Sequence, residues 1–176
     1  MCFTQDHLYF DDMAVGQEWE SYGRTVTEAD LVNFSGLSGD FNPIHVDAEF
    51  ARNTPFRARI AHGILVFSFA SGMASTTPRV RTIAMKAIQD WQFKEPVFIG
   101  DTVRLRSRIA NIEVRGRGRR AIITWHRQVL NQDNKVVQEG HSVTLVEGRA
   151  NAQHADDNDT DKIQDNTPLQ LTAQAS

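Results

Sequence analysis

The sequence has little of what builds disulfide frameworks or membrane spans. Its 176 residues include one cysteine, Cys2, which cannot form a disulfide within the chain and therefore favours a reducing compartment. The N-terminus has no basic stretch followed by an apolar run, so it does not resemble a signal peptide. The longest apolar stretch, residues 64–74, is interrupted by serine and glycine and is shorter than the roughly 20 residues that cross a bilayer. These absences predict a cytoplasmic protein with no membrane partner.

Charge is also sparse where a polyanionic partner would need it. The formal net charge is -3, and acidic residues gather between 147 and 176, so the remainder of the chain is nearly neutral. We therefore expect no broad basic surface and no nucleic-acid partner. The sequence has no His-x-x-x-His pattern, phosphate loop or dinucleotide fingerprint, which predicts no metal ion and no separate cofactor.

The composition is ordinary for one globular domain, with 40% hydrophobic and 23% charged residues. Beyond Val146 large apolar residues almost disappear, and such a composition cannot offset the entropy lost on ordering. We predict one folded domain over residues 1–147 and a flexible, polar and acidic tail over residues 148–176.

The first half of the chain contains helix signals. Thr27, followed by acids, is typical of an N-cap and predicts a helix of about two turns, after which Gly36 and Gly39 break regular structure. Asp47 is expected to cap a second short helix. Residues 63–75 are almost all apolar or small, which predicts a long central helix buried on nearly all sides.

The second half of the chain reads as strands that close spacing should pair antiparallel. Val103 and Leu105 alternate with arginines, so one face of this sheet should be apolar and the other wet. The fold class is therefore α+β, with one antiparallel sheet wrapped around the central helix. The expected strands cover residues 18–26, 82–93, 102–114, 120–130 and 136–146.

One short segment brings a carboxylate and an imidazole together, Asp40-Phe41-Asn42-Pro43-Ile44-His45. In general acid–base catalysis a carboxylate accepts a proton from water, and a histidine that titrates near neutrality orients that water and shuttles the proton. We expect both groups on a loop, where catalytic residues are commonly held. The same residue types also suit a plain turn, with Asp40 and Asn42 bonding the backbone.

A second feature is the His62-Gly63 pair that opens the apolar helix. The Gly63 N–H has no partner within the helix and lies at the positive end of its dipole. An enoyl thioester attacked at its β-carbon develops negative charge on the thioester oxygen, which such a donor stabilises. Gly63 also has no side chain to keep a substrate carbonyl away. A glycine merely tolerated near a helix start is the plainer interpretation.

Three segments in this order resemble the MaoC-like dehydratases, also called R-specific enoyl-CoA hydratases or hydratase 2. The resemblance spans most of residues 1–146. The sequence departs from the family pattern in its long polar tail and in two arginines before the His-Gly pair, Arg57 and Arg59. The matching segments are Phe34-Ser35-Gly36-Leu37-Ser38-Gly39-Asp40-Phe41-Asn42-Pro43-Ile44-His45, Ala61-His62-Gly63-Ile64-Leu65 and Phe93-Lys94-Glu95-Pro96-Val97-Phe98-Ile99-Gly100-Asp101.

The resemblance implies a hot-dog fold, a homodimer or higher homo-oligomer with active sites near the dimer interface, and a hydro-lyase. The reaction would be the reversible hydration of trans-2-enoyl-CoA to (R)-3-hydroxyacyl-CoA. The water-activating dyad falls on Asp40 and His45, and the orienting asparagine on Asn42. The oxyanion glycine falls on Gly63, and an active-site serine on Ser71. A serine inside an apolar helix more often bonds a carbonyl one turn back.

Coenzyme A would enter as part of the acyl-CoA substrate, and its phosphates need cationic contacts. A solvated strand face and a charged hairpin explain the same side chains without a ligand. The candidate arginines are Arg104, Arg106, Arg108, Arg115, Arg117, Arg119 and Arg120.

Two other functions stay open at this stage. A hot-dog acyl-CoA thioesterase is expected to carry its carboxylate on the central helix, and residues 63–75 contain no acid. A non-catalytic acyl-CoA-binding module would keep the fold without turnover, because fold alone does not fix function. An intact set of aspartate, asparagine and histidine argues against the binding module.

Overall fold

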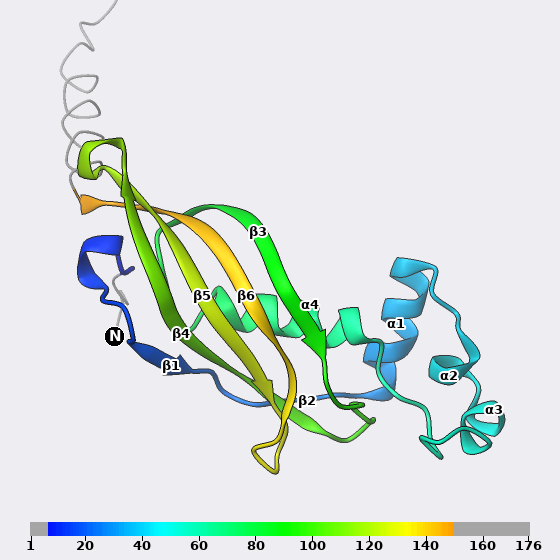
Figure 1. Cartoon of the computed structure of the whole chain (residues 1–176). Coiled ribbons are helices and arrows are strands. Elements are labelled where there is room, and N and C mark those ends of the chain that lie inside the picture. The colour runs from blue at the N-terminus through cyan, green and yellow to red at the C-terminus, as the bar shows by residue number, and fades with distance from the viewer. Residues whose placement is uncertain (1–6, 150–176) are drawn as a thin grey trace, which may run out of the picture.

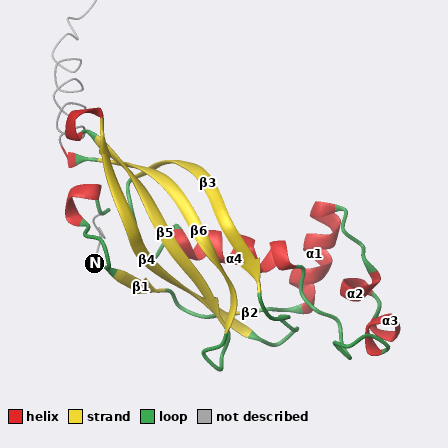
Figure 2. Ribbon diagram, viewed as in Figure 1, coloured by secondary structure: helices red, strands yellow, loops and turns green. Residues whose placement is uncertain are grey.

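A twisted antiparallel sheet carries helix α4 on one face, and three shorter helices extend beyond one end of the sheet (Figures 1 and 2). The computed structural model describes residues 7–149. The six strands have the order β1-β4-β5-β6-β3, and β2 pairs with β4 beside that path. This arrangement confirms the predicted α+β class with one sheet and one central helix.

The elements follow one another along the chain as η1 (Phe10–Asp12), β1 (Glu18–Glu20), β2 (Arg24–Thr25), α1 (Glu28–Ser38), α2 (Pro43–Val46), α3 (Ala48–Arg52), α4 (Gly63–Ala74), β3 (Thr82–Phe93), β4 (Thr102–Arg115), η2 (Gly116–Gly118), β5 (Arg120–Leu130) and β6 (Val136–Glu147).

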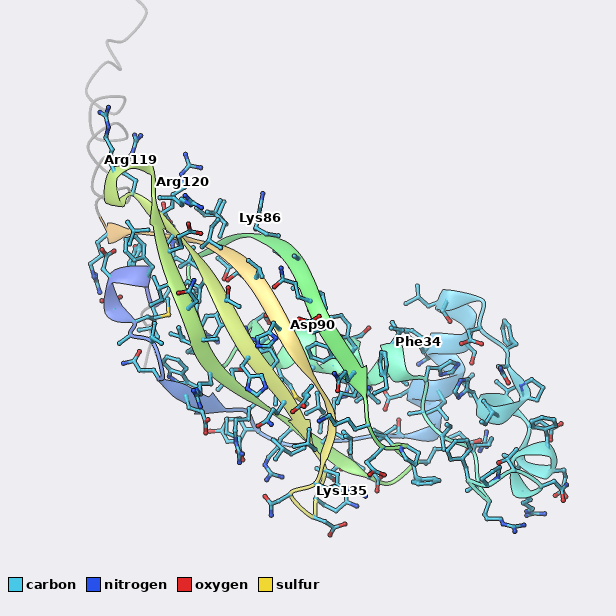
Figure 3. All side chains as sticks on the ribbon, in the orientation of Figure 1. Phe34, Lys86, Asp90, Arg119, Arg120 and Lys135 are labelled. Atoms are coloured by element: carbon cyan, nitrogen blue, oxygen red, sulfur yellow. The ribbon has the colours of Figure 1, made fainter. Side chains whose placement is uncertain are left out.

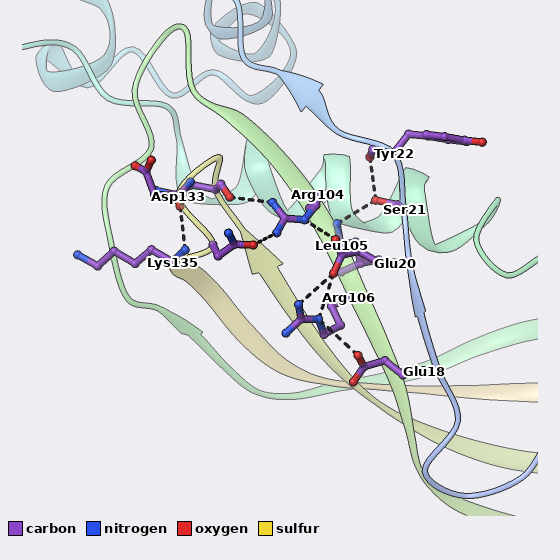
Figure 4. A network of polar contacts seen from close by, with 11 residues as sticks. Glu18, Glu20, Ser21, Tyr22, Arg104, Leu105, Arg106, Asp133 and Lys135 are labelled. Carbon is purple, nitrogen blue, oxygen red and sulfur yellow. Dashed lines mark hydrogen bonds and ion pairs between the residues drawn. The ribbon is translucent and has the colours of Figure 1, made fainter.

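Strand β4 shows the predicted alternation most clearly. Val103 and Leu105 are fully buried and belong to the core cluster that includes residues of α4. The intervening arginines lie on the outer face, where Glu20 of β1 binds both Arg104 and Arg106 (Figure 4). These outer charges are therefore paired with acids of the neighbouring strand.

The prediction of one continuous N-terminal strand over residues 18–26 is wrong. Two short strands, β1 and β2, replace it and both pair with β4. Ser21 lies between them, and its hydroxyl accepts a hydrogen bond of 2.9 Å from the N–H of Leu105. A side chain at Gly23 would come within 2.9 Å of Thr102, so the strand passes its neighbour closely there.

Helix α1 begins where it was predicted and ends later. The Thr27 hydroxyl accepts a hydrogen bond from the N–H of Asp30, and the Asp30 carboxylate accepts one of 2.8 Å from the N–H of Thr27. The expected break at Gly36 is wrong, because the helix continues to Ser38 and is capped by Gly39, which adopts a left-handed conformation with φ of 76°. A glycine inside a helix costs about 1 kcal/mol relative to alanine, which weakens a helix without ending it.

Helix α4 is less buried than its composition predicted. Leu65, Val66, Phe69 and Ala70 face the core, but Ile64 is 55% exposed. The prediction of burial on nearly all sides is therefore wrong, because one sheet covers only one side of a helix. The other exposed positions on α4 are Ser68, Ser71 and Gly72.

Most of the predicted flexible tail, residues 148–176, lies outside the described residues. Its first two residues are described, and Arg149 binds the carboxylate of Asp12 at 2.7 Å. No helix among residues 7–149 is long and apolar enough to cross a membrane.

Candidate active site

The segment before α2 is fixed by side chains that bond its own backbone. The Asp40 carboxylate accepts a hydrogen bond of 3.1 Å from the N–H of Asn42, and the Asn42 side chain accepts one of 3.2 Å from the N–H of Ile44. Asn42 is thereby the N-cap of α2, and Asp47 caps α3 as predicted. The turn-forming roles are real, and they hold an exposed Asp40 carboxylate in one place.

His45 does not lie on a loop, as was expected, but in the short helix α2. Its Nδ1 lies 2.8 Å from the carbonyl oxygen of Ile60, and a carbonyl only accepts. The proton of the neutral ring is therefore on Nδ1. This leaves Nε2 unprotonated and able to take a proton from water.

His62 is a site residue that sequence reasoning treated only as the neighbour of Gly63. Its ring stacks on that of His45 with centroids 3.8 Å apart, and it is 2% exposed. Its Nε2 lies 3.0 Å from the main-chain oxygen of Asp40 and 3.3 Å from the hydroxyl of Ser35. His62 therefore joins the turn before α2 to α1 and to the imidazole of His45. In the sequence, only the position of His62 directly before the central helix pointed to a role in the site.

The surroundings of His62 lower its pKa and so favour the neutral ring. Burial lowers the pKa of this ring, and the neighbouring His45 lowers it further, although the Asp40 main-chain oxygen acts in the opposite direction. Its buried Nδ1 has no hydrogen-bond partner among residues 7–149. A neutral His62 can stack on His45 without repelling a proton that His45 takes up.

Gly63 opens α4, and its surroundings exclude a side chain. A Cβ at this position would lie 2.8 Å from ring atoms of Phe93. The Gly63 carbonyl accepts a hydrogen bond of 2.9 Å from the side chain of Gln138, which is 2% exposed. Within the described part of the chain the Gly63 N–H makes no hydrogen bond. A fixed and unoccupied donor at a helix start suits an oxyanion.

A cavity of about 530 Å³ joins His45 to Gly63. Its walls are mostly apolar and include Phe93 and Val97, and Lys94 also lines it. Asp40 lies beside this cavity, since Asp40, His45 and His62 each offer a side-chain oxygen or nitrogen within 4.8 Å of the others. The structure thus brings together Asp40, Asn42, His45 and Gly63.

The cluster of Asp40, His45 and His62 is also the group that could hold a metal ion. Nδ1 of His45 and Nε2 of His62 already face main-chain oxygens, so each ring has one nitrogen left for a ligand. The prediction that no metal is needed stays a prediction.

Ser71 is not brought to this cavity. It lies two turns further along α4 and lines a second cavity, between the helix and the sheet. Ser68 makes the bond to a carbonyl one turn back, from its hydroxyl to the oxygen of Ile64 at 2.8 Å. In one chain Ser71 cannot touch a substrate atom that Gly63 holds, because eight residues of helix span about 12 Å.

The arginines proposed for coenzyme A are mostly occupied or remote in one chain. Arg104 and Arg106 bind Glu20, and Arg115 binds Glu113. Arg119 and Arg120 lie at the tip of the β4–β5 hairpin, at the opposite end of the molecule from Phe34 of α1 (Figure 3). The predicted phosphate contacts remain untested.

Known proteins share both the sequence pattern and the fold. The family model of the MaoC like domain matches residues 12–128. An (R)-specific enoyl-CoA hydratase from Rhodospirillum rubrum is 37% identical over 142 residues, covering 80% of this chain and 93% of the relative. The solved MaoC-like dehydratase from Rhodospirillum rubrum is 25% identical with a TM-score of 0.70, covering 81% of this chain and 98% of that one.

A double hot-dog protein, Rv0216 from Mycobacterium tuberculosis, shares the fold, with a TM-score of 0.71 and 18% identity over 81% of this chain and 44% of that one. The sheet around α4 is therefore a hot-dog fold. The chain belongs to the MaoC-like dehydratase family and is an enzyme of the hydratase and dehydratase class.

Proposed function

We propose that this enzyme adds water reversibly to trans-2-enoyl-CoA and forms (R)-3-hydroxyacyl-CoA. The observation that carries the proposal is the hydrogen bond from Nδ1 of His45 to the oxygen of Ile60. It leaves Nε2 as the basic nitrogen of the His45 ring. This ring and Gly63 line the same cavity. The name of the relative from Rhodospirillum rubrum supports both the substrate and the product configuration.

In the hydration direction, Asp40 and His45 hold one water between them. Its oxygen attacks the β-carbon while the dyad takes one of its protons, and the electron pair of the double bond moves to the α-carbon and the thioester oxygen. The Gly63 N–H stabilises the negative charge on that oxygen. The proton held by the dyad then passes to the α-carbon, so the atoms of one water are added in full. Dehydration uses the same groups in reverse.

Asn42 acts through position, since it caps α2 and thereby orients His45. Coenzyme A is part of the substrate in this scheme, and no further cofactor takes part. Ser71 is left without a role in a single chain and would reach a reacting group only from a second copy. We place the reaction in the cytoplasm, as the lone cysteine suggests.

The enzyme is proposed to act as a homodimer through strand β3. This strand is at one edge of the sheet, and an unpaired edge readily accepts another strand. Ile83, Met85 and Phe93 on it are each more than half exposed. Ile64 on α4 is likewise exposed, so a second chain would cover apolar surface that one sheet leaves open.

The test is the loss of conjugated enoyl absorbance when the purified protein meets a series of trans-2-enoyl-CoA substrates. Turnover by the wild type, abolished in Asp40→Asn, supports the assignment. Asp47→Asn is the matched control, because asparagine also caps a helix and Asp47 lies outside the cavity. An Asp40→Asn variant that folds and retains full turnover would contradict the dyad. Thiol release without hydration would favour a thioesterase.

A further inference from the structure

Arg127 is a charged side chain on the face of the sheet that should be apolar. It lies on β5 in the same alternating row as Ile123, Trp125 and Val129, which are all buried core residues. The residue is 6% exposed. This is the face that packs toward α4, so Arg127 differs from the arginines of the outer face.

The buried guanidinium has hydroxyl partners but no acid. Its Nε donates to the hydroxyl of Ser142 at 3.1 Å, and Nη1 donates to the hydroxyl of Ser107. The group also lies over the ring of Trp125, 4.5 Å from the centroid. No carboxylate within residues 7–149 forms an ion pair with it. A buried charge without a counter-ion is costly, which makes this position unusual in a core.

The charge is nevertheless present at neutral pH. Burial lowers the pKa of Arg127 to about 10, which still leaves the guanidinium protonated under physiological conditions. Arginine has five N–H donors in a planar fork, and the two serine hydroxyls use two of them. Donors therefore remain for a further acceptor.

Arg127 lines the second cavity, which has a volume of about 240 Å³. The walls are largely apolar and include Met85, Ile88, Trp91 and Leu105. A cavity with long apolar walls and a cation at one point fits a chain that is apolar along its length and anionic at its end.

The second cavity follows the first along the same helix. Gly63 lines the first cavity, and Phe67, one turn later on the same side of α4, lines the second. The rings of Phe67 and Trp91 meet edge to face with centroids 4.7 Å apart. The Gln138 side chain, which holds the Gly63 carbonyl, also accepts a hydrogen bond of 3.1 Å from the Trp91 indole.

We infer that the second cavity receives the far end of the acyl chain and that Arg127 binds a carboxylate there, which makes enoyl-CoA thioesters of dicarboxylic acids the favoured substrate class. This inference rests on the proposed hydration. A carboxylate at the chain end supplies the counter-ion that residues 7–149 do not provide, and it forms two parallel hydrogen bonds with the guanidinium fork. An acyl chain ending in methyl leaves the charge unpaired.

The experiment compares pairs of trans-2-enoyl-CoA substrates of equal chain length, one ending in a carboxylate and the other in a methyl group. We expect the wild type to have the higher kcat/KM with the carboxylate substrate at its preferred length. Arg127→Met should lower that preference by roughly 10- to 100-fold, because hydrogen bonds to a charged group are lost. Arg127→Met should also keep or increase turnover of the methyl substrate.

The matched control is Arg149→Met, since Arg149 is exposed and already has Asp12 as its counter-ion. It should leave the preference unchanged. Equal preference for methyl and carboxylate ends in the wild type, or the same preference in wild type and folded Arg127→Met, would overturn the inference.

Absence of turnover with every substrate would instead contradict the proposed hydration. In that case calorimetric titration with saturated acyl-CoA pairs still tests Arg127. Tighter binding of the carboxylate member, lost in Arg127→Met, supports the carboxylate site, and equal affinities overturn it.

Discussion

The polar side chains near the two ends of helix α4 differ in their hydrogen-bond partners. At the first turn, His45 and His62 each face a main-chain oxygen, and Gln138 holds the Gly63 carbonyl. Toward the last turns, Arg127 faces a cavity, and its partners within residues 7–149 are hydroxyls and no acid. The difference matches the two tasks that we propose for the two cavities. The imidazoles of His45 and His62, which must keep one orientation, lie within hydrogen-bonding distance of main-chain oxygens. The guanidinium of Arg127, which we propose binds an anion, has no acidic partner among residues 7–149.

The largest expected effect concerns the first end. Asp40→Asn removes the carboxylate that we propose takes the proton from water, while keeping the oxygen that accepts from the N–H of Asn42. We expect kcat to fall by roughly 10²- to 10⁴-fold with little change in stability, as is usual for a general acid–base group. Steady-state kinetics with thermal unfolding of the same samples measures both quantities. A fall in kcat matched by a loss of folded protein would point to a structural role instead.

Gly63→Ala tests whether packing and chemistry make separate demands on the helix start. The new Cβ meets the Phe93 ring, so we expect a loss of roughly 1–3 kcal/mol in the free energy of unfolding. The double variant with Phe93→Ala should relieve the clash. Activity should stay low in both variants, because the methyl group occupies space beside the N–H that we propose as the oxyanion donor. Recovery of full activity together with stability would show that Gly63 serves packing alone.

Arg127→Met tests the second end without substrate. Arg127→Met removes a buried charge that has no acidic partner among residues 7–149, and this gain offsets the loss of the hydrogen bonds to Ser107 and Ser142. We therefore expect the midpoint of urea unfolding to stay or rise. Arg106→Met, which removes an exposed ion pair with Glu20, should cost less than about 1 kcal/mol. A large loss of stability in Arg127→Met would mean that the charge serves the fold.

The smallest expected effect is a pH dependence from His62. Burial lowers its pKa in the folded protein, whereas the unfolded ring titrates near 6.5. As the pH falls below that value, the unfolded chain binds a proton that the folded chain does not, so the free energy of unfolding decreases toward the folded-state pKa. Urea unfolding over this range should show the decrease in the wild type and a flatter curve in His62→Gln. Identical slopes would exclude His62 as the cause.

The strands in the second half of the chain could be predicted closely, because alternation identifies each strand and turn residues mark its two ends. Strand β3 covers the predicted residues, and β4 and β6 each extend one residue further. The broken N-terminal strand could not be predicted, since the interruption depends on the Ser21 hydroxyl bonding a residue of β4. Such a bond joins positions far apart in the sequence, and no local pattern carries it.

Only part of the site could be predicted, because some of its residues are neighbours in the sequence and others meet only in the fold. Asp40, Asn42 and His45 share one short segment, so local spacing brings them together, and the resemblance to the family assigned their roles. His62 belongs to the site because its ring stacks on that of His45, a contact that only the fold creates. Ser71 lies further along α4 and lines the other cavity. The alternation along β5 places Arg127 in the apolar row, but the sequence alone does not tell which side chains surround its guanidinium there.

The packing around Gly63 has a consequence for how this position is inherited. The Phe93 ring fills the place of a side chain there, so substitutions are disfavoured by the folding of the chain whether or not the reaction matters. Loss of the Asp40 carboxylate would leave this packing demand on Gly63 unchanged as long as Phe93 keeps its place. The presence of a glycine at this position in a relative therefore reflects the shape of the helix start, and it is not by itself evidence of the proposed hydration.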